Sequence, residues 1–181
     1  METKDAEILK LYADGRTDEA FNAIVASCVE RLYWHLRRFV CSHEDADDLL
    51  QETLVKVWNS IGNFKGGSSL YTWIWRIATN EALSFLRRNR LRAAMKAESL
   101  ETLMDRLIDE DGWFDGNELQ REVQKAVNSL PARQKQVFVL RYFDEMPYEQ
   151  MSEVLNISVG SLKASYHHAY TKVKDYLEKR F

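Results

Sequence analysis

Hydrophobic residues recur at helical spacing along most of the first 95 positions. The first periodic stretch covers residues 5–40. A second helix is predicted from about His43 to Ser60, because Ser42 fits an N-cap and Asp45 follows three residues later. A third begins near Leu70 and runs to Arg90 or further. The expected core positions are Phe21, Ile24, Val25, Val29, Leu32, Tyr33 and Leu36, followed by Ala46, Leu49, Leu50, Leu54, Val57 and either Trp58 or Ile61.

Two polar, glycine-containing segments interrupt the periodic pattern. Residues 62–69 (GNFKGGSS) form the clearest loop, in which Ser68 or Ser69 can cap the following helix. Residues 97–118 read as an acidic linker, partly helical near Leu100–Ile108 and broken at residues 109–112 and 115–117.

Four helices are predicted after this linker, over residues 118–129, 131–142, 147–155 and from 158 onward. Proline fits the opening turn of the second and third of them, at Pro131 and Pro147. Asn156 tolerates the left-handed conformation that ends a helix, and Ser158 can cap the next one. A short helix, a three-residue turn and a longer helix make a helix-turn-helix pattern.

The last helix carries two faces. An apolar stripe consists of Leu162, Tyr166, Ala169, Val173 and Leu177. The opposite face presents small and hydrogen-bonding side chains: Gly160, Ser161, Lys163, Ala164, His167, His168 and Thr171. Such a face suits the floor of a DNA groove, although a solvated polar face has the same pattern.

Composition agrees with helices throughout. The chain has 7 Gly and 2 Pro in 181 residues, which favours long helices over tight turns. The expected fold class is all-α, with two small helical domains at 5–96 and 119–181 joined by the acidic linker, the second being the helix-turn-helix. Cys28 and Cys41 indicate a reduced, cytoplasmic protein, and we expect no signal peptide and no membrane insertion.

The formal net charge of −3 hides a segregation of charge. Residues 73–96 hold six basic and one acidic side chain, net +5, whereas residues 97–121 hold two and eight, net −6. Residues 1–72 carry net −4 and residues 122–181 net +2. Two positive blocks divided by a negative one are typical of a protein that meets a polyanion in two places.

The helix from Leu70 is aromatic at its start and basic at its end. Tyr71, Trp73 and Trp75 near a glycine-containing loop could stack on unpaired bases, and the later arginines could hold phosphates. The alternative is that Trp73, Ile74, Ile77 and Leu83 are core residues. Some of the aromatic side chains must be in the core, because not all of them can face outward.

The helix from His43 is acidic on one face, where Asp45, Asp48 and Glu52 align. A metal site including His43, a carboxylate pair for catalysis, a docking face for a basic protein surface and a merely solvated face all fit this pattern. The spacing matches no known ligand set, and the chain shows no nucleophile or phosphate loop. We therefore expect no catalytic residue, no metal and no cofactor.

Taken together, three stretches resemble bacterial RNA polymerase sigma factors of the extracytoplasmic function (ECF) group. They are residues 45–53 (DADDLLQET), residues 71–80 (YTWIWRIATN), and residues 130–134 (LPARQ) leading to 158–163 (SVGSLK). The similarity covers about residues 20–95 and 119–178. In the recognition helix the chain departs from the family, because Ser165, His168 and Tyr170 stand where many members have arginine.

The resemblance implies a role for each feature. The acidic helix would dock on the clamp helices of the polymerase's largest subunit, through Asp45, Asp48, Leu49, Gln51 and Glu52. The loop and the aromatic–basic helix would capture the melted −10 strand, through Asn63, Phe64, Lys65, Ser68, Tyr71, Trp73, Arg76, Asn80, Arg87 and Arg88. The last helix would read the double-stranded −35 element, through Ser158, Gly160, Ser161, Lys163, Ala164, His167, His168 and Thr171. An anti-sigma factor is a further implied partner.

Two other hypotheses stay open at this point. A free-standing helix-turn-helix regulator with an N-terminal sensing domain would leave the acidic helix and the aromatic–basic helix unexplained. A carboxylate-dependent enzyme would lack the expected catalytic groups.

Overall fold

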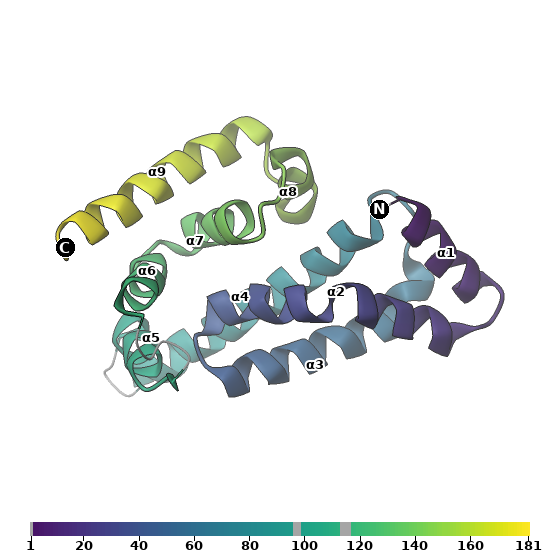
Figure 1. Cartoon of the computed structure of the whole chain (residues 1–181), viewed down its shortest axis with the longest axis horizontal. Helices are drawn as coiled ribbons and strands as arrows, with labels where there is room; N and C mark the ends of the chain where they lie inside the picture. Colours follow the sequence, from purple (N-terminus) through teal and green to yellow (C-terminus); the bar gives the residue numbers. More distant parts are fainter. Residues whose placement is uncertain (1, 96–98, 113–116) are drawn as a thin grey trace.

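The computed structural model describes residues 2–95, 99–112 and 117–181 (Figure 1). Over those residues the chain forms helices and no strand, which confirms the all-α prediction. The elements in chain order are α1 (Glu2–Ala13), α2 (Thr17–Val40), α3 (His43–Ser60), the 3₁₀ turn η1 (Ile61–Asn63), α4 (Leu70–Met95), α5 (Leu100–Asp109), α6 (Glu118–Asn128), α7 (Ala132–Phe138), the π-helical turn η3 (Val139–Phe143), α8 (Tyr148–Leu155) and α9 (Val159–Glu178).

The predicted helical stretch 5–40 is two helices. α1 ends at Ala13 and α2 begins at Thr17. Gly15 turns the chain between them with a φ of 78°, a conformation that other residues adopt at a cost. Residues 13–19 (ADGRTDE) interrupt the apolar pattern for about two helical turns, so the sequence does mark this break, and the prediction of one continuous stretch passed over it.

The predicted caps are present. Ser42 Oγ accepts from the Asp45 amide at 3.3 Å and Ser158 Oγ from the Ser161 amide at 3.4 Å. Asn156 ends α8 in the left-handed region with φ 55°. Ser69, rather than Ser68, caps α4, because its hydroxyl accepts from the Thr72 amide at 3.1 Å. Each of these helix ends is therefore fixed by residues within three positions of it.

The core stripe of α3 settles the choice between Trp58 and Ile61. Ile61 is buried, whereas Trp58 is 40% exposed and lies edge-on to Phe21. Thr53 was not expected in the core but is fully buried on the same stripe.

Most of the predicted linker that the structure describes is helical. α5 packs on α6 and α4, and its residues Met104 and Ile108 bury Cys41 in a small apolar cluster. Arg37 of α2 forms an ion pair with Asp111 just beyond α5. The basic residue Lys96 and the break at residues 115–116 lie outside the described residues. The domain limits 5–96, 97–118 and 119–181 stay a prediction, since one hydrophobic core includes residues of both halves.

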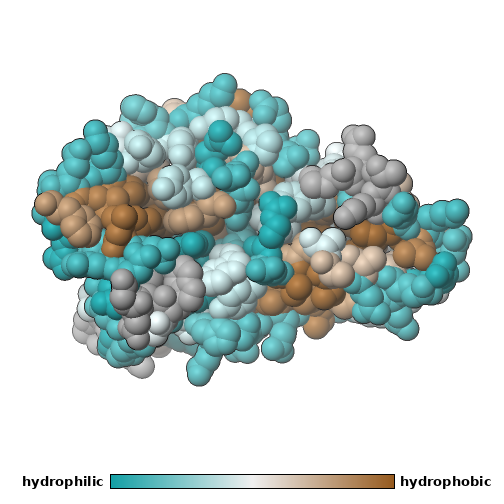
Figure 2. Space-filling model, in the orientation of Figure 1, coloured by the Kyte–Doolittle hydropathy of each residue, from teal (hydrophilic) through white to brown (hydrophobic). Residues whose placement is uncertain are grey.

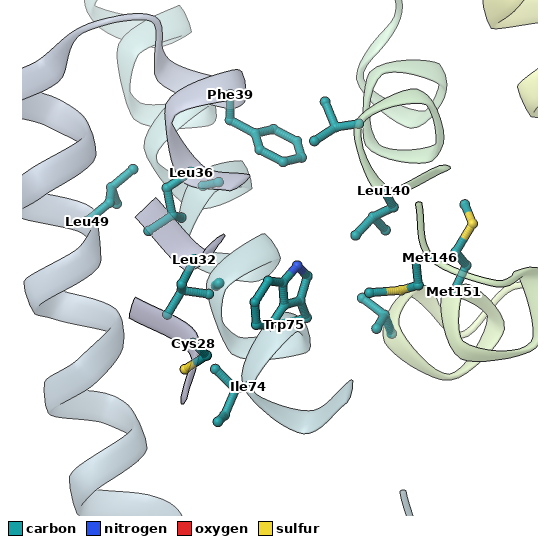
Figure 3. Close-up of a cluster of buried hydrophobic side chains, with 14 of the residues drawn as sticks. Cys28, Leu32, Leu36, Phe39, Leu49, Ile74, Trp75, Leu140, Met146 and Met151 are labelled. Atoms are coloured by element: carbon teal, nitrogen blue, oxygen red, sulfur yellow. The ribbon is translucent and has the colours of Figure 1, made fainter. Parts of the chain in front are cut away.

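The N-terminal helices α1–α4 and the C-terminal elements α6–α9 with η3 are called the two halves here, and the surface on which they meet is called the seam. The seam is centred on Trp75. The side chain has 0% exposure, and Figure 3 shows it between Leu32 and Ile74 on one side and Leu140 and Met146 on the other. α4 accordingly packs against α8, and α2 packs against η3. The C-terminal half is docked on α4 rather than held apart from it.

Buried polar contacts cross the same seam. Asp144 Oδ2 accepts from His35 Nδ1 at 2.6 Å and from Trp75 Nε1 at 3.3 Å. Within the N-terminal half, His35 Nε2 lies 3.1 Å from the Thr79 hydroxyl, which donates to it when Nδ1 carries the proton. These partners are 109, 69 and 44 residues apart in sequence.

A second polar group joins the halves near the end of α2. Lys135 Nζ donates to the Phe39 carbonyl at 3.0 Å and to Asn128 Oδ1 at 2.7 Å, and the Gln124 amide donates to the Arg38 carbonyl at 2.9 Å. Burial lowers the pKa of Lys135. Because buried donors without acceptors are costly, these bonds fix one alignment of the seam.

We expect the docking of α5 to weaken as pH rises from 5 to 7. Burial raises the pKa of Asp105 to about 6, above the ordinary value for an unfolded chain. The folded state therefore holds this proton more tightly and loses that advantage as pH rises through about 6. The nearby charged groups are Lys125, Glu101, Asp109 and Glu122.

Urea denaturation at pH 5 and pH 7.5 checks this expectation. Asp105→Asn, which is neutral at both pH values, should raise the free energy of unfolding at pH 7.5 by about 1 kcal/mol, a figure reduced for solvent screening of this half-buried carboxyl. Glu110→Gln, on an exposed side chain close by, is the matched control. An equal pH dependence in wild type and Asp105→Asn would contradict the assignment.

Candidate nucleic-acid interface

The acidic side chains of α3 lie on the outside of the helical bundle. Asp48, Gln51 and Glu52 are exposed, and Asp45 is half-buried next to the N-cap. Burial raises the pKa of Asp45. Asp48, Gln51 and Glu52 form what we call the acidic face.

Leu49 does not belong to that face. It is only 1% exposed and packs in the core beneath the acidic face. Its expected role as a surface contact is therefore corrected, because α3 turns this position, with Ala46 and Thr53, toward the other helices. The exposed apolar residues beside the acidic face are instead Val55 and Trp58, at 58% and 40% exposure.

His43 stands near the start of α3. Its Nδ1 lies 2.7 Å from the Tyr33 hydroxyl and its Nε2 lies 3.3 Å from Asp47. Both contacts occupy the ring nitrogens with protein partners. Over the described residues, no group of three or more His, Cys, Asp or Glu side chains is placed to hold a metal ion.

The loop between η1 and α4 presents its middle to solvent. Asn63, Lys65, Gly66 and Gly67 are exposed, and Ser68 is half-buried. Phe64 turns inward, with its ring 5.4 Å from that of Trp73. The loop therefore offers a polar, open rim next to two partly buried aromatic rings.

The three aromatic side chains at the start of α4 differ in environment. Trp73 is half-buried beside the loop, while Trp75 is wholly buried. Tyr71 stacks on Trp75 with centroids 3.9 Å apart, and Arg31 donates to its hydroxyl at 3.1 Å. Burial raises the pKa of Tyr71. The suggestion that Trp75 could stack on bases is wrong for this conformation, whereas Trp73 keeps an accessible edge.

The second half of α4 is a row of exposed cations. Arg87, Arg88, Arg90 and Arg92 are exposed, as is Asn80 about two turns before Arg87, whereas Arg76 is half-buried. Glu81 is the one acidic residue between positions 73 and 96. It forms an ion pair with Lys56 of α3 at 2.5 Å, so it does not neutralise the arginine row.

The outer side of α9 matches its predicted face. Ser158, Gly160, Ser161, Lys163, Ala164, His167, His168 and Thr171 are all exposed. We call these residues the recognition face. Leu162, Ala169 and Val173 are buried on the opposite side, and Tyr166 and Leu177 are half-buried there. A Cβ on Gly160 would meet nothing within 4 Å, so the helix backbone is open to a close approach at this point.

Of the three positions where many family members carry arginine, Tyr170 is 49% exposed, His168 is exposed and Ser165 is half-buried. Lys163 lies 5.7 Å from the ring centre of Tyr148. It is the one lysine or arginine on the recognition face, which makes the face weakly attractive to phosphate.

A groove lies between the end of α4, α5 and the start of α7. Its lining includes the apolar residues Leu83, Leu86 and Met104, the exposed Arg87 and Arg90, and the buried Lys135. On the face shown in Figure 2 the surface is mostly hydrophilic, with hydrophobic side chains gathered in separate patches.

The sequence pattern did not single out several residues that shape these surfaces. Asp144 and His35 hold the seam over Trp75, and Asp5 and Tyr12 of α1 touch the loop region from another helix. All four act on residues far away in the sequence, so no periodicity or local spacing could reveal them.

Two protein families match the chain. The family described as Sigma-70 region 2 matches residues 24–92, and the family described as Sigma-70, region 4 matches residues 120–173. The first match includes the acidic face, the loop and the arginine row, and the second includes the recognition face.

Among curated relatives, the ECF RNA polymerase sigma factor SigE of Mycolicibacterium smegmatis is 29% identical over 164 residues. That alignment covers 88% of this chain but 62% of the relative, which is a longer protein. The ECF RNA polymerase sigma-E factor of Haemophilus influenzae is 29% identical over 169 residues, with 88% of each chain covered.

Two solved structures share the fold. CnrH, solved in complex with the cytosolic domain of CnrY, gives a TM-score of 0.72 at 22% identity, covering 97% of this chain and 98% of CnrH. The sigma factor RpoE of Bartonella quintana, solved with the anti-sigma factor NepR, gives 0.68 at 23% identity, covering 87% and 96%. Within the described part of the chain, no helix has the length and apolarity to cross a membrane.

Proposed function

Because the chain belongs to the ECF group of RNA polymerase sigma factors, we propose that it binds core RNA polymerase, directs it to particular promoters and assists promoter melting. The observation that carries this proposal is the presence of region 2 and region 4 in one chain, each with its polar face exposed. A free-standing helix-turn-helix regulator would not account for region 2. The proposal assigns no catalytic step to the protein itself.

The acidic face supports a contact with the polymerase. Asp48, Gln51 and Glu52 are exposed and stand in the stretch that resembles the family's clamp-helix contact. A row of acidic side chains on a rigid helix complements a basic protein surface and speeds encounter with it. We propose that this face docks on the clamp helices of the largest subunit, with Trp58 at its apolar end.

The loop and α4 support capture of a melted −10 strand. An unpaired base can stack on an aromatic or apolar surface that has a polar rim, and Phe64, Trp73 and the exposed loop offer both. The arginine row that starts at Arg87 continues along the same helix and would hold the backbone of the separated strand. In this proposal the loop holds the base and the arginines hold its phosphates.

The recognition face supports readout of the −35 element. Its small residues let α9 enter the major groove, where Ser161, Lys163 and His167 could hydrogen-bond to bases and phosphates. With one lysine on the face, the electrostatic attraction is modest, so we propose that the polymerase supplies most of the affinity.

An anti-sigma factor is a further proposed partner. The solved structure of Bartonella quintana RpoE contains one, and that of CnrH contains the cytosolic domain of CnrY. We place this protein in the cytoplasm, where core polymerase and promoters are found, and propose no insertion into the membrane.

The described conformation has to open if both promoter elements are read together. Elements centred about 25 base pairs apart on B-DNA lie about 85 Å apart. α4 has 26 residues and α9 has 20, so these helices are about 39 and 30 Å long and cannot span that distance while their halves touch. We therefore propose that η3 and α8 leave Trp75 when the protein engages polymerase and promoter.

Charge reversal on the acidic face tests the polymerase contact. Asp48→Lys with Glu52→Lys should weaken binding to core polymerase at least about tenfold, since complementary charges become repulsive. Unfolding stability should change by less than about 0.5 kcal/mol per site, because both side chains are exposed. Binding is measured by titration of fluorescent protein with core enzyme, with Glu30→Lys on α2 as control. Unchanged affinity would show that the acidic face of α3 is not part of the interface with the polymerase.

Truncation on the recognition face tests −35 readout. Lys163→Ala with His167→Ala should lower transcription from promoters that carry a −35 element, by about 1–3 kcal/mol per lost contact. Run-off transcription with core enzyme gives the measurement, and Lys174→Ala, on the same helix outside the face, is the control. A loss that depended on −10 variants alone would show that the face is wrongly assigned.

Removing the carboxylate at the seam tests the opening. Asp144→Ala leaves the buried donors of His35 and Trp75 without an acceptor, which should disfavour the closed form by about 1–3 kcal/mol. Energy transfer between dyes at exposed positions on α3 and α9 should then report a larger mean separation. Glu153→Ala, on an exposed α8 side chain, should leave it unchanged. Equal separations for Asp144→Ala and wild type would refute this role of the seam.

A further inference from the structure

The loop between η1 and α4 has few contacts of its own. Phe64 closes η1 through its amide, which donates to the Ile61 carbonyl at 3.0 Å. Beyond it, a Cβ at Gly66 or Gly67 would meet nothing within 4 Å, and Gly66 has a φ of 71°. The shape of the loop therefore depends on how its two ends are held.

Helix α1 contacts both ends of this loop. At the far end, Asp5 Oδ2 accepts from the amide of Leu70 at 2.9 Å. At the near end, the hydroxyl of Tyr12 lies 2.7 Å from the position that a Cβ on Gly62 would occupy. A side chain at Gly62 would displace Tyr12, so glycine permits this close approach.

These two contacts come from one face of α1. Asp5 and Tyr12 are seven residues apart, with Ile8 between them at three residues from Asp5. Ile8 is buried in the core that α2, α3 and α4 share. The helix is thus fixed to the bundle at its centre and contacts the loop on both sides of that point.

The contact at Leu70 is chemically specific. The first amides of a helix have no partner within the helix, and its N-terminus carries a partial positive charge. The Ser69 hydroxyl accepts from the Thr72 amide, and the Asp5 carboxylate accepts from the Leu70 amide. A charged acceptor at this position fixes the start of α4 and the direction in which residues 65–69 enter the helix.

We propose that α1 is a brace for the 61–69 loop and that Asp5 is a positioning residue for the −10 element. By holding the first turn of α4 against the loop, Asp5 keeps Phe64 packed on Trp73, with ring centres 5.4 Å apart, so that the two rings form one apolar surface on which an unpaired base can stack. The brace lies outside the matched region 2, which begins at residue 24. This inference rests on the proposed function, because it concerns the choice of base during promoter melting.

The test compares Asp5→Ala and Asp5→Asn with Glu7→Ala. Glu7 is an exposed acid two residues away on α1, so the control removes the same charge from the same helix. Hydrogen exchange of the segment 61–72 in the free protein reports the brace directly. Asp5→Ala should speed exchange of the Leu70 amide about fivefold, the effect expected from losing one helix cap, and Glu7→Ala should not.

Transcription by core polymerase from a promoter library randomised at the −10 and −35 elements reports the function. Asp5→Ala should reduce the preference for the best −10 sequences over the average by about fivefold and leave the −35 preference as in wild type. Asp5→Asn keeps an oxygen acceptor without the charge, so its −10 preference should lie between those of wild type and Asp5→Ala.

The inference would be overturned if exchange of the Leu70 amide were unchanged in Asp5→Ala, or if its −10 profile were unchanged. A uniform loss of transcription over all −10 and −35 sequences would also overturn it, because that result indicates destabilisation only. Failure of the proposed function would be visible earlier and separately. In that case wild type itself would give no polymerase-dependent transcripts, while the exchange result would still decide whether Asp5 holds the loop.

Discussion

The burial of Trp75 under the C-terminal half is the constraint on which the rest of the structure depends. A wholly buried indole carries one N–H that needs an acceptor, and Asp144 provides it from 69 residues away. The same carboxylate accepts from His35, so one side chain satisfies buried donors of both α2 and α4. An apolar seam alone would tolerate sliding, whereas these directed bonds allow only one alignment of the two halves.

The local parts of this fold could be predicted from the sequence. The caps at Ser42 and Ser158 and the left-handed Asn156 involve residues no more than four positions from the helix ends that they fix. The polar outer side of α9 follows from its period. The turn at Gly15 was not predicted, although residues 13–19 (ADGRTDE) interrupt the apolar pattern there. For Leu49 the helical period correctly predicts a core position, whereas the family motif that implies a contact role does not separate buried from exposed positions.

The non-local parts could not be predicted in this way. Trp73 and Trp75 look alike in sequence, but one lines the open loop and the other is sealed beneath η3 and α8. Which ring faces outward depends on partners such as Asp144 and Met146, to which no pattern around position 75 points. For the same reason, the sequence indicated that α4 carries promoter chemistry without indicating that another part of the chain lies against it.

Two carboxylates accept hydrogen bonds from α4, and they therefore have different tasks. Asp144 holds Trp75 from the C-terminal half, and in our proposal this contact is lost when the protein opens. Asp5 holds the Leu70 amide from α1, which is anchored by Ile8 in the core of the N-terminal helices. Because this second contact includes no residue of the C-terminal half, opening of the seam leaves it intact. The loop can thus keep its shape while the recognition face moves away to its own stretch of DNA, which is what reading two separated elements with one chain requires.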